Sequence, residues 1–212
     1  MHKKPADELL RDGLKILDIS FVEDQITQFL TYLAELKKWN RAYNLTALKT
    51  DADIVIKHFL DSLLFLKVLP HYVKSIADVG SGAGFPGIPL KIIRPDIEIV
   101  LIEPVQKKAL FLEHMQRVLS MSGTRIMNIR VEDIHDLLVD AAVTRALFSV
   151  GEFINKAERL LEERGVLILS KGPKLKDELR GLETSGITRE DLVLPFEKSI
   201  RHLVIVKKRS QK

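Results

Sequence analysis

Residues 75–90 are Ser-Ile-Ala-Asp-Val-Gly-Ser-Gly-Ala-Gly-Phe-Pro-Gly-Ile-Pro-Leu, and this stretch decides the fold. An apolar run at residues 76–79 leads into four glycines within eight residues, and an apolar segment of helical character follows them. Glycine lacks Cβ, so it adopts positive φ angles and lets a ligand approach the backbone closely. The amides at the start of the following helix would face an anionic or polar group. An ordinary tight turn does not need four glycines with an acid before them. The stretch therefore predicts a strand, a ligand-binding turn and a helix.

The spacing of these glycines distinguishes between two kinds of nucleotide site. Residues 82–87 fit the G-x-G-x-x-G fingerprint of dinucleotide-binding folds. In that fingerprint the first glycine follows the strand directly, and counting from Gly80 puts Phe85 in the place of the third glycine. The spacing Asp78-x-Gly80-x-Gly82-x-Gly84 instead resembles the first motif of class I S-adenosylmethionine-dependent methyltransferases.

A second acidic residue occupies a position from which it could bind the ribose of a nucleotide. Glu103 ends another apolar run, residues 97–102. It lies close to the offset of about 20 residues at which a carboxylate accepts hydrogen bonds from ribose hydroxyls. The sequence therefore predicts that Glu103 and the glycine turn bind the same cofactor.

Length and composition limit the remaining possibilities. The 212 residues suffice for one domain, or one domain with an extension, and 46% of them are apolar and 29% charged. No apolar run approaches the ~20 residues of a membrane span, and the N-terminus lacks the apolar core of a signal peptide. The absence of cysteine excludes disulfides and thiolate chemistry and fits a cytoplasmic protein. The net charge of +4 permits a nucleic-acid partner without establishing one.

The first 70 residues predict a helical extension packed on a main domain that spans residues 71–212. Apolar residues recur at helical spacing in residues 5–17, 22–39 and 51–69, with a loop at residues 40–50. Trp39 and Tyr43 at the start of this loop are expected in a buried junction rather than an active-site loop. His58 is expected to be hydrogen-bonded to structure, because the six histidines are scattered and no H-x-x-x-H metal pair exists.

After Gly80 strands and helices alternate, which predicts βαβ units and a mainly parallel sheet. The expected strands are residues 76–79, 97–102, 125–130, 141–146 and 166–170, followed by a terminal pair at 187–194 and 201–206. The expected helices are residues 87–93, 106–121, 151–163 and 174–181. Val131 and Glu132 follow the third strand and Arg145 ends the fourth, at the edge where open α/β sheets bind ligands. Arg145 is either a functional residue or a plain salt-bridge partner.

Six motifs spread over the chain carry a more specific resemblance. They are Tyr43-Asn44-Leu45-Thr46, His58-Phe59-Leu60-Asp61-Ser62, Asp78 to Pro89, Thr144-Arg145-Ala146, Leu169-Ser170-Lys171-Gly172 and Arg201-His202-Leu203-Val204. Together they resemble the small-subunit ribosomal RNA methyltransferase G family, also called glucose-inhibited division protein B. The match covers roughly residues 36–207. The Phe-Pro-Gly-Ile-Pro continuation at residues 85–89 separates the chain from generic methyltransferases.

The resemblance implies a fold, a reaction and partners. The fold is α/β and Rossmann-like, the class I methyltransferase architecture: a mainly parallel seven-stranded sheet flanked by helices, with its last strand antiparallel. S-adenosylmethionine is the implied methyl donor, S-adenosylhomocysteine its product, and N7 of one guanosine in 16S ribosomal RNA the acceptor. The implied partner is 16S ribosomal RNA or the 30S subunit. We expect a cytoplasmic monomer with no metal and no membrane contact.

The resemblance also implies site residues, position by position. Asp78, Gly80, Gly82, Gly84 and Phe85 form the cofactor loop, and Gly80 and Phe85 fall where the family's loop contacts the cofactor. Glu103 takes the ribose hydroxyls, at a position where Asp is equally expected. Val131 and Glu132 border the adenine, and Arg145 is the binding arginine.

The implied chemistry needs positioning rather than acid–base catalysis. Guanine N7 carries a lone pair and no proton, so its methylation requires no general base. Orientation alone reaches effective molarities of ~10⁵–10⁸ M in well-aligned reactions. We therefore expect Arg145 to act in catalysis by positioning substrate or cofactor. Its guanidinium, or an ammonium such as that of Lys171, would donate to guanine O6 or to phosphate.

Basic residues late in the chain are candidates for RNA contacts. Lys171, Lys174 and Arg201 are predicted to bind RNA, and the alternative is an ordinary solvated surface. A methyltransferase for a small molecule would use the same cofactor loop, and an enclosed apolar acceptor pocket would mark it. A non-catalytic binding module or a dinucleotide-binding domain is the third possibility.

Overall fold

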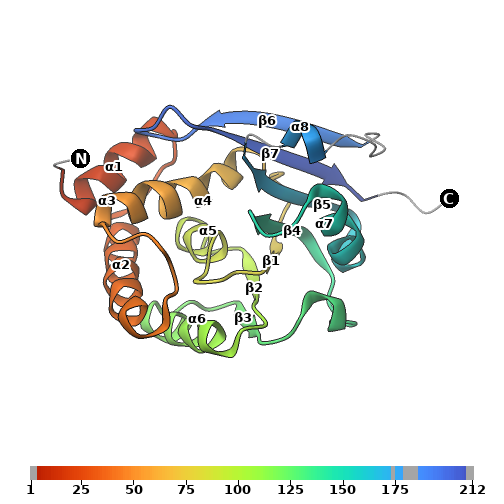
Figure 1. Cartoon of the computed structure of the whole chain (residues 1–212), viewed down its shortest axis with the longest axis horizontal. Helices are drawn as coiled ribbons and strands as arrows, with labels where there is room; N and C mark the ends of the chain where they lie inside the picture. Colours follow the sequence, from red (N-terminus) through yellow and green to blue (C-terminus); the bar gives the residue numbers. More distant parts are fainter. Residues whose placement is uncertain (1–3, 173–174, 179–185, 209–212) are drawn as a thin grey trace.

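A central sheet with helices on both faces organises the chain (Figure 1). The computed structural model describes residues 4–172, 175–178 and 186–208. Within these residues the strands are β1 (Ser75–Val79), β2 (Glu98–Ile102), β3 (Thr124–Met127), β4 (Val139–Arg145), β5 (Leu161–Lys171), β6 (Ile187–Val193) and β7 (Ile200–Lys207). They form one seven-stranded sheet in the order β3-β2-β1-β4-β5-β7-β6. The central strands are short apolar runs buried on both faces, as parallel sheets require.

The direction of the strands confirms the predicted architecture. β1, β2, β3, β4 and β5 pair in parallel, whereas β7 is antiparallel to both β5 and β6. The strand order reverses between β1 and β4, because β2 and β3 lie on one side of β1 and β4 on the other. In open α/β sheets ligands bind at such a reversal, beyond the carboxyl ends of the strands. The turn after β1 and the end of β4 are therefore the places to look for a site.

The helices divide between the two faces. One face is covered by α1 (Ala6–Ile16), α2 (Glu23–Tyr43), α3 (Asp51–Ile54), η1 (Val55–Leu60), α4 (Asp61–Leu63), η2 (Leu64–Lys67), α5 (Gly87–Ile93) and α6 (Gln106–Val118). The other is covered by η3 (Val131–Asp133), α7 (Val150–Ala157), η4 (Glu158–Leu160) and α8 (Leu175–Glu178). Alternation along the strands separates two cores, since Ile76 packs with the first set and Ala77 with the second. None of the described helices is both long and apolar enough to cross a membrane.

The N-terminal helices share a core with the sheet. Buried side chains of α1 and α2, among them Leu10 and Phe29, belong to the same apolar cluster as Ile76 of β1 and Leu101 of β2. Gly13 of α1 lies so close to η1 that a Cβ there would be 2.2 Å from Leu60. The extension is therefore packed on the central sheet, and the division of the chain at residue 70 stays a prediction.

The structure corrects several expected boundaries. Residues 161–163, expected in a helix, begin β5: Leu161 pairs with Val139 and Val166 with Ala141, so residues 162–165 bulge out between the two pairs. Leu161, Glu162 and Glu163 are good helix formers, but strand pairing overrides that local preference. β3 ends at Met127 rather than residue 130, and α6 ends at Val118 rather than residue 121.

Two further corrections concern the region before β1. The expected helix over residues 51–69 is a series of α, π and 3₁₀ segments ending at Lys67. α2 continues to Tyr43, and left-handed Asn44 ends it. Trp39 packs on Phe111, as expected of a junction, but Tyr43 is 41% exposed and is not buried.

Candidate functional site

The turn after β1 has the conformation predicted from its glycines. Gly80, Gly82 and Gly84 have φ angles of 75°, 60° and 98°, which confirms the predicted positive φ angles. The amide of Gly87, the first residue of α5, donates a 2.8 Å hydrogen bond to Asp78 Oδ2 at the end of β1. This bond ties the two ends of the glycine turn together.

Asp78 lies beneath the turn rather than at its surface. Its side chain is fully buried, and Oδ1 has no hydrogen-bond partner among the described residues. Burial raises the pKa of Asp78 to about 7, against the lowering effect of the bonds from Gly87 and Ser81. Asp78 therefore shapes the glycine turn, and any contact with a ligand would have to be made through that buried oxygen.

Glu103 reaches the same turn from the end of β2. Its carboxylate is 3% exposed, and it accepts hydrogen bonds from the amides of Gly82 at 2.8 Å and Val105 at 2.9 Å. A carboxylate offers about four lone-pair positions, so two amides leave room for further donors. The structure thus brings Glu103 and the glycine turn together, as the sequence predicts.

Val131 and Glu132 follow β3 in the short helix η3. Val131 is buried in the core between the sheet and α7. Glu132 is paired with Lys156 of α7, which lowers the pKa of Glu132. Its side chain is 44% exposed. The structure places both residues at the expected strand end, with the Glu132 carboxylate already held by an ammonium group.

Arg145, at the end of β4, is held by residues of the first face. Nη1 donates to the backbone oxygen of Lys57 at 2.9 Å and to Asp61 Oδ2 at 3.1 Å, and Nη2 donates to His58 Nδ1 at 2.9 Å. The guanidinium carbon lies over the Phe85 ring, 5.1 Å from its centroid. Arg145 is thus fixed against the glycine turn, because Phe85 belongs to that turn.

The hydrogen bonds of His58 define its protonation state. Nδ1 accepts from Arg145, so Nε2 carries the proton and donates to Thr46 Oγ1 at 2.7 Å. The ring stacks on Phe85 at a centroid distance of 4.4 Å. Burial first, and then the charge of Arg145, lowers the pKa of His58 to about 3. His58 is therefore neutral and structural, as expected, and both of its nitrogens are engaged.

This lowered pKa predicts a pH dependence of stability. Unfolded His58 takes up a proton near pH 6.5, whereas folded His58 does so only near pH 3. The unfolding free energy should therefore fall as the pH drops from 6.5, by up to about 1.4 kcal/mol per pH unit from this group. Urea unfolding between about pH 5 and about pH 6.5 should show a slope of unfolding free energy against pH that is lower in His58→Asn than in wild type, by up to about 1.4 kcal/mol per pH unit. Parallel curves would contradict the assignment. The raised pKa of Asp78 changes the unfolding free energy with pH in the opposite direction. Because Asp78 is present in both proteins, its contribution cancels in the difference between their slopes.

A cavity of about 510 Å³ opens beside Arg145. It is lined by Thr46, Ala47, Leu48, Lys57, His58, Asp61, Arg145, Ala146, Ser170, Lys171, Gly172 and Arg201. Two of the three predicted RNA contacts, Lys171 and Arg201, line it, and Lys174 lies outside the described residues. The cavity therefore joins the ends of β4 and β5 to the segment before β1.

Both basic residues are already bound to other groups. Lys171 Nζ donates to the backbone oxygen of Phe148 at 2.7 Å and pairs with Glu178 at 2.8 Å, and Arg201 Nε donates to Asp61 Oδ1 at 2.6 Å. They are part of the cavity wall rather than free surface cations.

Sequence reasoning missed two residues of this site. Asp61 is 5% exposed and receives hydrogen bonds from both Arg145 and Arg201. Tyr32 of α2 is fully buried, donates to the backbone oxygen of Ala83 in the glycine turn and stacks on Phe85. Asp61 lies in one of the motifs that resemble the family, so the sequence could have identified it. Tyr32 cannot be distinguished in the sequence from the other buried positions of α2.

The arrangement joins a glycine turn, a buried carboxylate and a basic cavity at one edge of the sheet. No group of three or more acid or histidine side chains positioned to hold a metal occurs in the described part of the chain. The amides of Gly80, Gly82 and Gly84 are already bonded within the protein, so the turn can bind a nucleotide-like cofactor by close approach to its backbone, beside the Glu103 carboxylate. The neighbouring cavity can bind a polar, electron-rich partner.

Comparison with known protein families gives a match over most of the chain. The model of the family "rRNA small subunit methyltransferase G" matches residues 25–204. A ribosomal RNA small subunit methyltransferase G from Francisella philomiragia is 34% identical, with 94% of this chain and 97% of the relative covered. The protein of that name from Neisseria meningitidis is also 34% identical, over 95% of this chain and 98% of the relative.

Solved structures share the fold at low sequence identity. A methyltransferase from Aquifex aeolicus, described as dependent on S-adenosylmethionine, is 16% identical with a TM-score of 0.55, over 74% of this chain and 93% of that one. M. jannaschii TYW2, crystallised with S-adenosylmethionine, is 16% identical with a TM-score of 0.52, over 73% of this chain and 76% of that one. Both likenesses concern the architecture alone.

Proposed function

The chain belongs to the ribosomal RNA small subunit methyltransferase G family, and we propose that it methylates N7 of one guanosine in 16S ribosomal RNA with S-adenosylmethionine as donor. The family match over residues 25–204 is the observation that carries this function. The substrate is the RNA itself or the 30S subunit. Bacterial ribosomal subunits lie in the cytoplasm, where the enzyme would act.

The residues at the carboxyl end of β1 fit this cofactor. A Cβ added to Gly82 would have only the Gly80 backbone oxygen within 4.0 Å, so the turn is open at that point. Glu103 retains acceptor positions for ribose hydroxyls, and Val131 supplies an apolar wall beyond β3. S-adenosylmethionine supplies an electrophilic methyl group on its sulfonium. We therefore assign Gly80, Gly82, Gly84, Phe85, Glu103, Val131 and Glu132 to its binding, with Asp78 acting through the turn.

The cavity beside Arg145 suits the guanine acceptor. Four basic residues line it, and its one acid, Asp61, is held by two of them. A guanidinium or ammonium group can donate to guanine O6 or to phosphate while N7 stays free to react. His58 has no free nitrogen to take a proton, which is compatible with a reaction that needs no base. A small-molecule methyltransferase would call for an enclosed apolar pocket, so this lining does not favour that alternative.

Methyl transfer to ribosomal substrates tests the proposal. We expect label from S-adenosylmethionine to appear as 7-methylguanosine when the protein acts on 30S subunits, or on protein-free 16S RNA, from cells that lack it. Subunits from cells that contain the protein are the control and should accept little label, because their site is already methylated. Cofactor binding without transfer to either substrate would contradict the proposal.

A further inference from the structure

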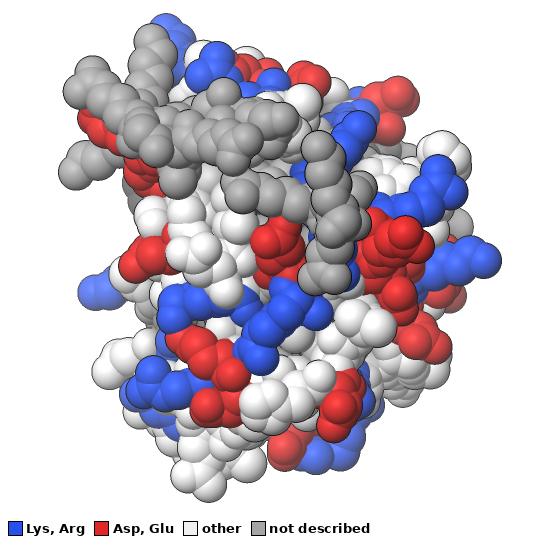
Figure 2. Space-filling model, turned by 90° about the vertical axis from the view of Figure 1, so that its right-hand side faces the viewer, with Lys and Arg blue, Asp and Glu red and all other residues white. Residues whose placement is uncertain are grey.

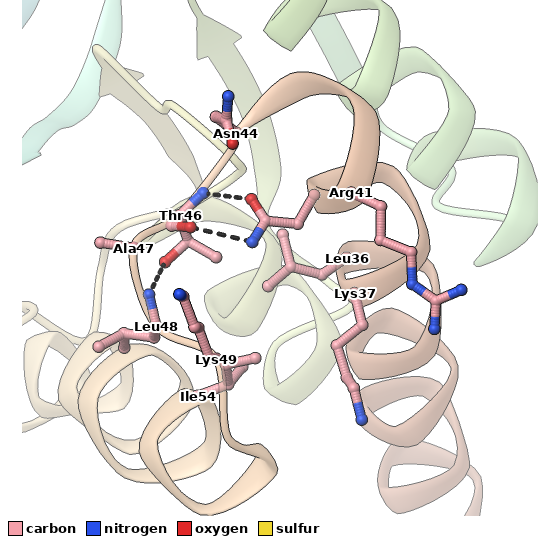
Figure 3. Close-up of a pocket in the computed structure, with 10 residues that line it drawn as sticks. Leu36, Lys37, Arg41, Asn44, Thr46, Ala47, Leu48, Lys49 and Ile54 are labelled. Atoms are coloured by element: carbon pink, nitrogen blue, oxygen red, sulfur yellow. Dashed lines mark hydrogen bonds between the residues drawn. The ribbon is translucent and has the colours of Figure 1, made fainter.

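A second cavity, of about 750 Å³, lies next to the first. It is lined by Leu36, Lys37, Asn40, Arg41, Asn44, Thr46, Ala47, Leu48, Lys49 and Ile54. In Figure 3, Lys37 and Arg41 come from α2 on one side, and Lys49 comes from the segment that follows Leu48 on the other. Residues 46–48 line both cavities, so the two are neighbours across a single stretch of backbone.

The lining of this second cavity is positively charged. Its described residues include three cations and no acid. Lys37 is paired with Asp51 at 2.5 Å, outside the lining, whereas Arg41 and Lys49 are exposed and have no ion-pair partner in the described ranges. Figure 2 shows a different face of the molecule, on which Lys and Arg side chains are interspersed with Asp and Glu. The positive charges of Arg41 and Lys49 in this cavity are therefore not neutralised by acidic side chains of the described residues.

The wall between the two cavities has a fixed shape. Asn40 binds both backbone polar atoms of Thr46, with its Nδ2 donating to the oxygen at 2.9 Å and its Oδ1 accepting from the amide at 2.8 Å. The Thr46 hydroxyl accepts from the amide of Leu48 at 3.1 Å and from His58. The wall is thus connected to Arg145 through His58. A preorganised wall reduces the ordering cost of binding.

We propose that this second cavity binds the sugar–phosphate backbone of the substrate RNA beside the target guanosine, with Arg41 and Lys49 as phosphate contacts. The inference rests on the proposed function. A base presented to the first cavity must leave its stack. A strand that continues from it across the wall at residues 46–48 enters the second cavity. Unpaired cations on both sides of a groove suit a single-stranded backbone, and Leu36, Leu48 and Ile54 offer apolar surface to its sugars or bases.

Salt dependence of methylation tests the two contacts. In the Arg41→Ala/Lys49→Ala double variant we expect KM for the ribosomal substrate to rise while kcat and cofactor affinity stay unchanged. The slope of log(kcat/KM) against log salt should become shallower by about 1.4, because each single-strand phosphate contact contributes about 0.7. Lys67→Ala/Arg125→Ala is the matched control, since it removes the same charge from exposed sites without ion-pair partners in the described chain, and it should behave as wild type.

Cross-linking identifies the partner directly. With the photoreactive residue p-benzoylphenylalanine in place of Lys49, we expect adducts with 16S RNA that ribonuclease shortens. Adducts with ribosomal proteins alone, or a salt slope equal to that of wild type in the double variant, would overturn the inference. Failure of the wild-type protein to methylate any ribosomal substrate would instead overturn the proposed function, so the two failures are distinguishable.

Discussion

The Gly80→Val variant is expected to lose binding of S-adenosylmethionine. Gly80 follows β1 directly and has a φ angle of 75°, a left-handed conformation that a β-branched residue adopts only at a cost of about 1–3 kcal/mol. A Cβ there would also lie 2.1 Å from Leu147 Cδ2. The exposed Leu147 side chain can move away from that Cβ, but the backbone strain is relieved only if the turn changes conformation, which would displace the backbone and the Glu103 carboxylate at the proposed cofactor site.

We expect the Kd for S-adenosylmethionine, measured by calorimetry, to rise by about two orders of magnitude, since each 1.4 kcal/mol is about tenfold. Gly186→Val is the matched control. Gly186 has a φ angle of 81°, and an added Cβ would meet nothing within 4 Å. This control has the same backbone strain, far from the turn in the sequence, and should keep its affinity. If the two variants bound S-adenosylmethionine with equal affinity, the glycine turn would not be part of the cofactor site.

The features that could be predicted from the sequence are those set by local pattern. Apolar runs gave the central strands, and the glycine spacing gave positive φ angles in the turn after β1. The meeting of Glu103 with that turn followed from a topological rule, because the ends of adjacent parallel strands share an edge. Each of these depends on few residues, close in sequence or linked by a general rule of sheet topology.

The features that could not be predicted are side-chain partnerships between distant segments. Arg201 and Asp61 are 140 positions apart, and Tyr32 and Ala83 are 51 apart. Periodicity identifies the buried face of a helix but not which buried position carries a hydrogen bond. For the same reason the sequence predicts an RNA contact at Lys171 but not its partners in the cavity wall, the backbone oxygen of Phe148 and the carboxylate of Glu178. Residues 161–163 lie in a strand rather than in the expected helix because the pairing of Leu161 with Val139 of β4 outweighs their helical composition.

The Arg145→Ala variant is expected to lose most of its methylation activity while keeping its fold. The guanidinium joins three parts of the site, since it binds Lys57 and Asp61, donates to His58 and covers Phe85 of the glycine turn. Without it, acceptor and cofactor are no longer held in one geometry. A misplacement of about 1 Å costs roughly 100-fold in rate, and we expect a fall in kcat of that order.

Arg145→Lys separates positioning from charge. Lysine keeps the charge but lacks the planar fork that donates to His58 and Asp61 at once, so we expect only weak rescue of kcat. The pKa of His58, followed by NMR, gives a second measurement: because the Arg145 charge lowers it, the pKa should rise in Arg145→Ala and less in Arg145→Lys. Unchanged turnover in Arg145→Ala, together with a raised His58 pKa, would show that Arg145 serves only as an ion-pair partner of Asp61. Loss of turnover in Arg145→Ala, with only weak rescue in Arg145→Lys, would instead show that the guanidinium maintains the geometry of the acceptor site.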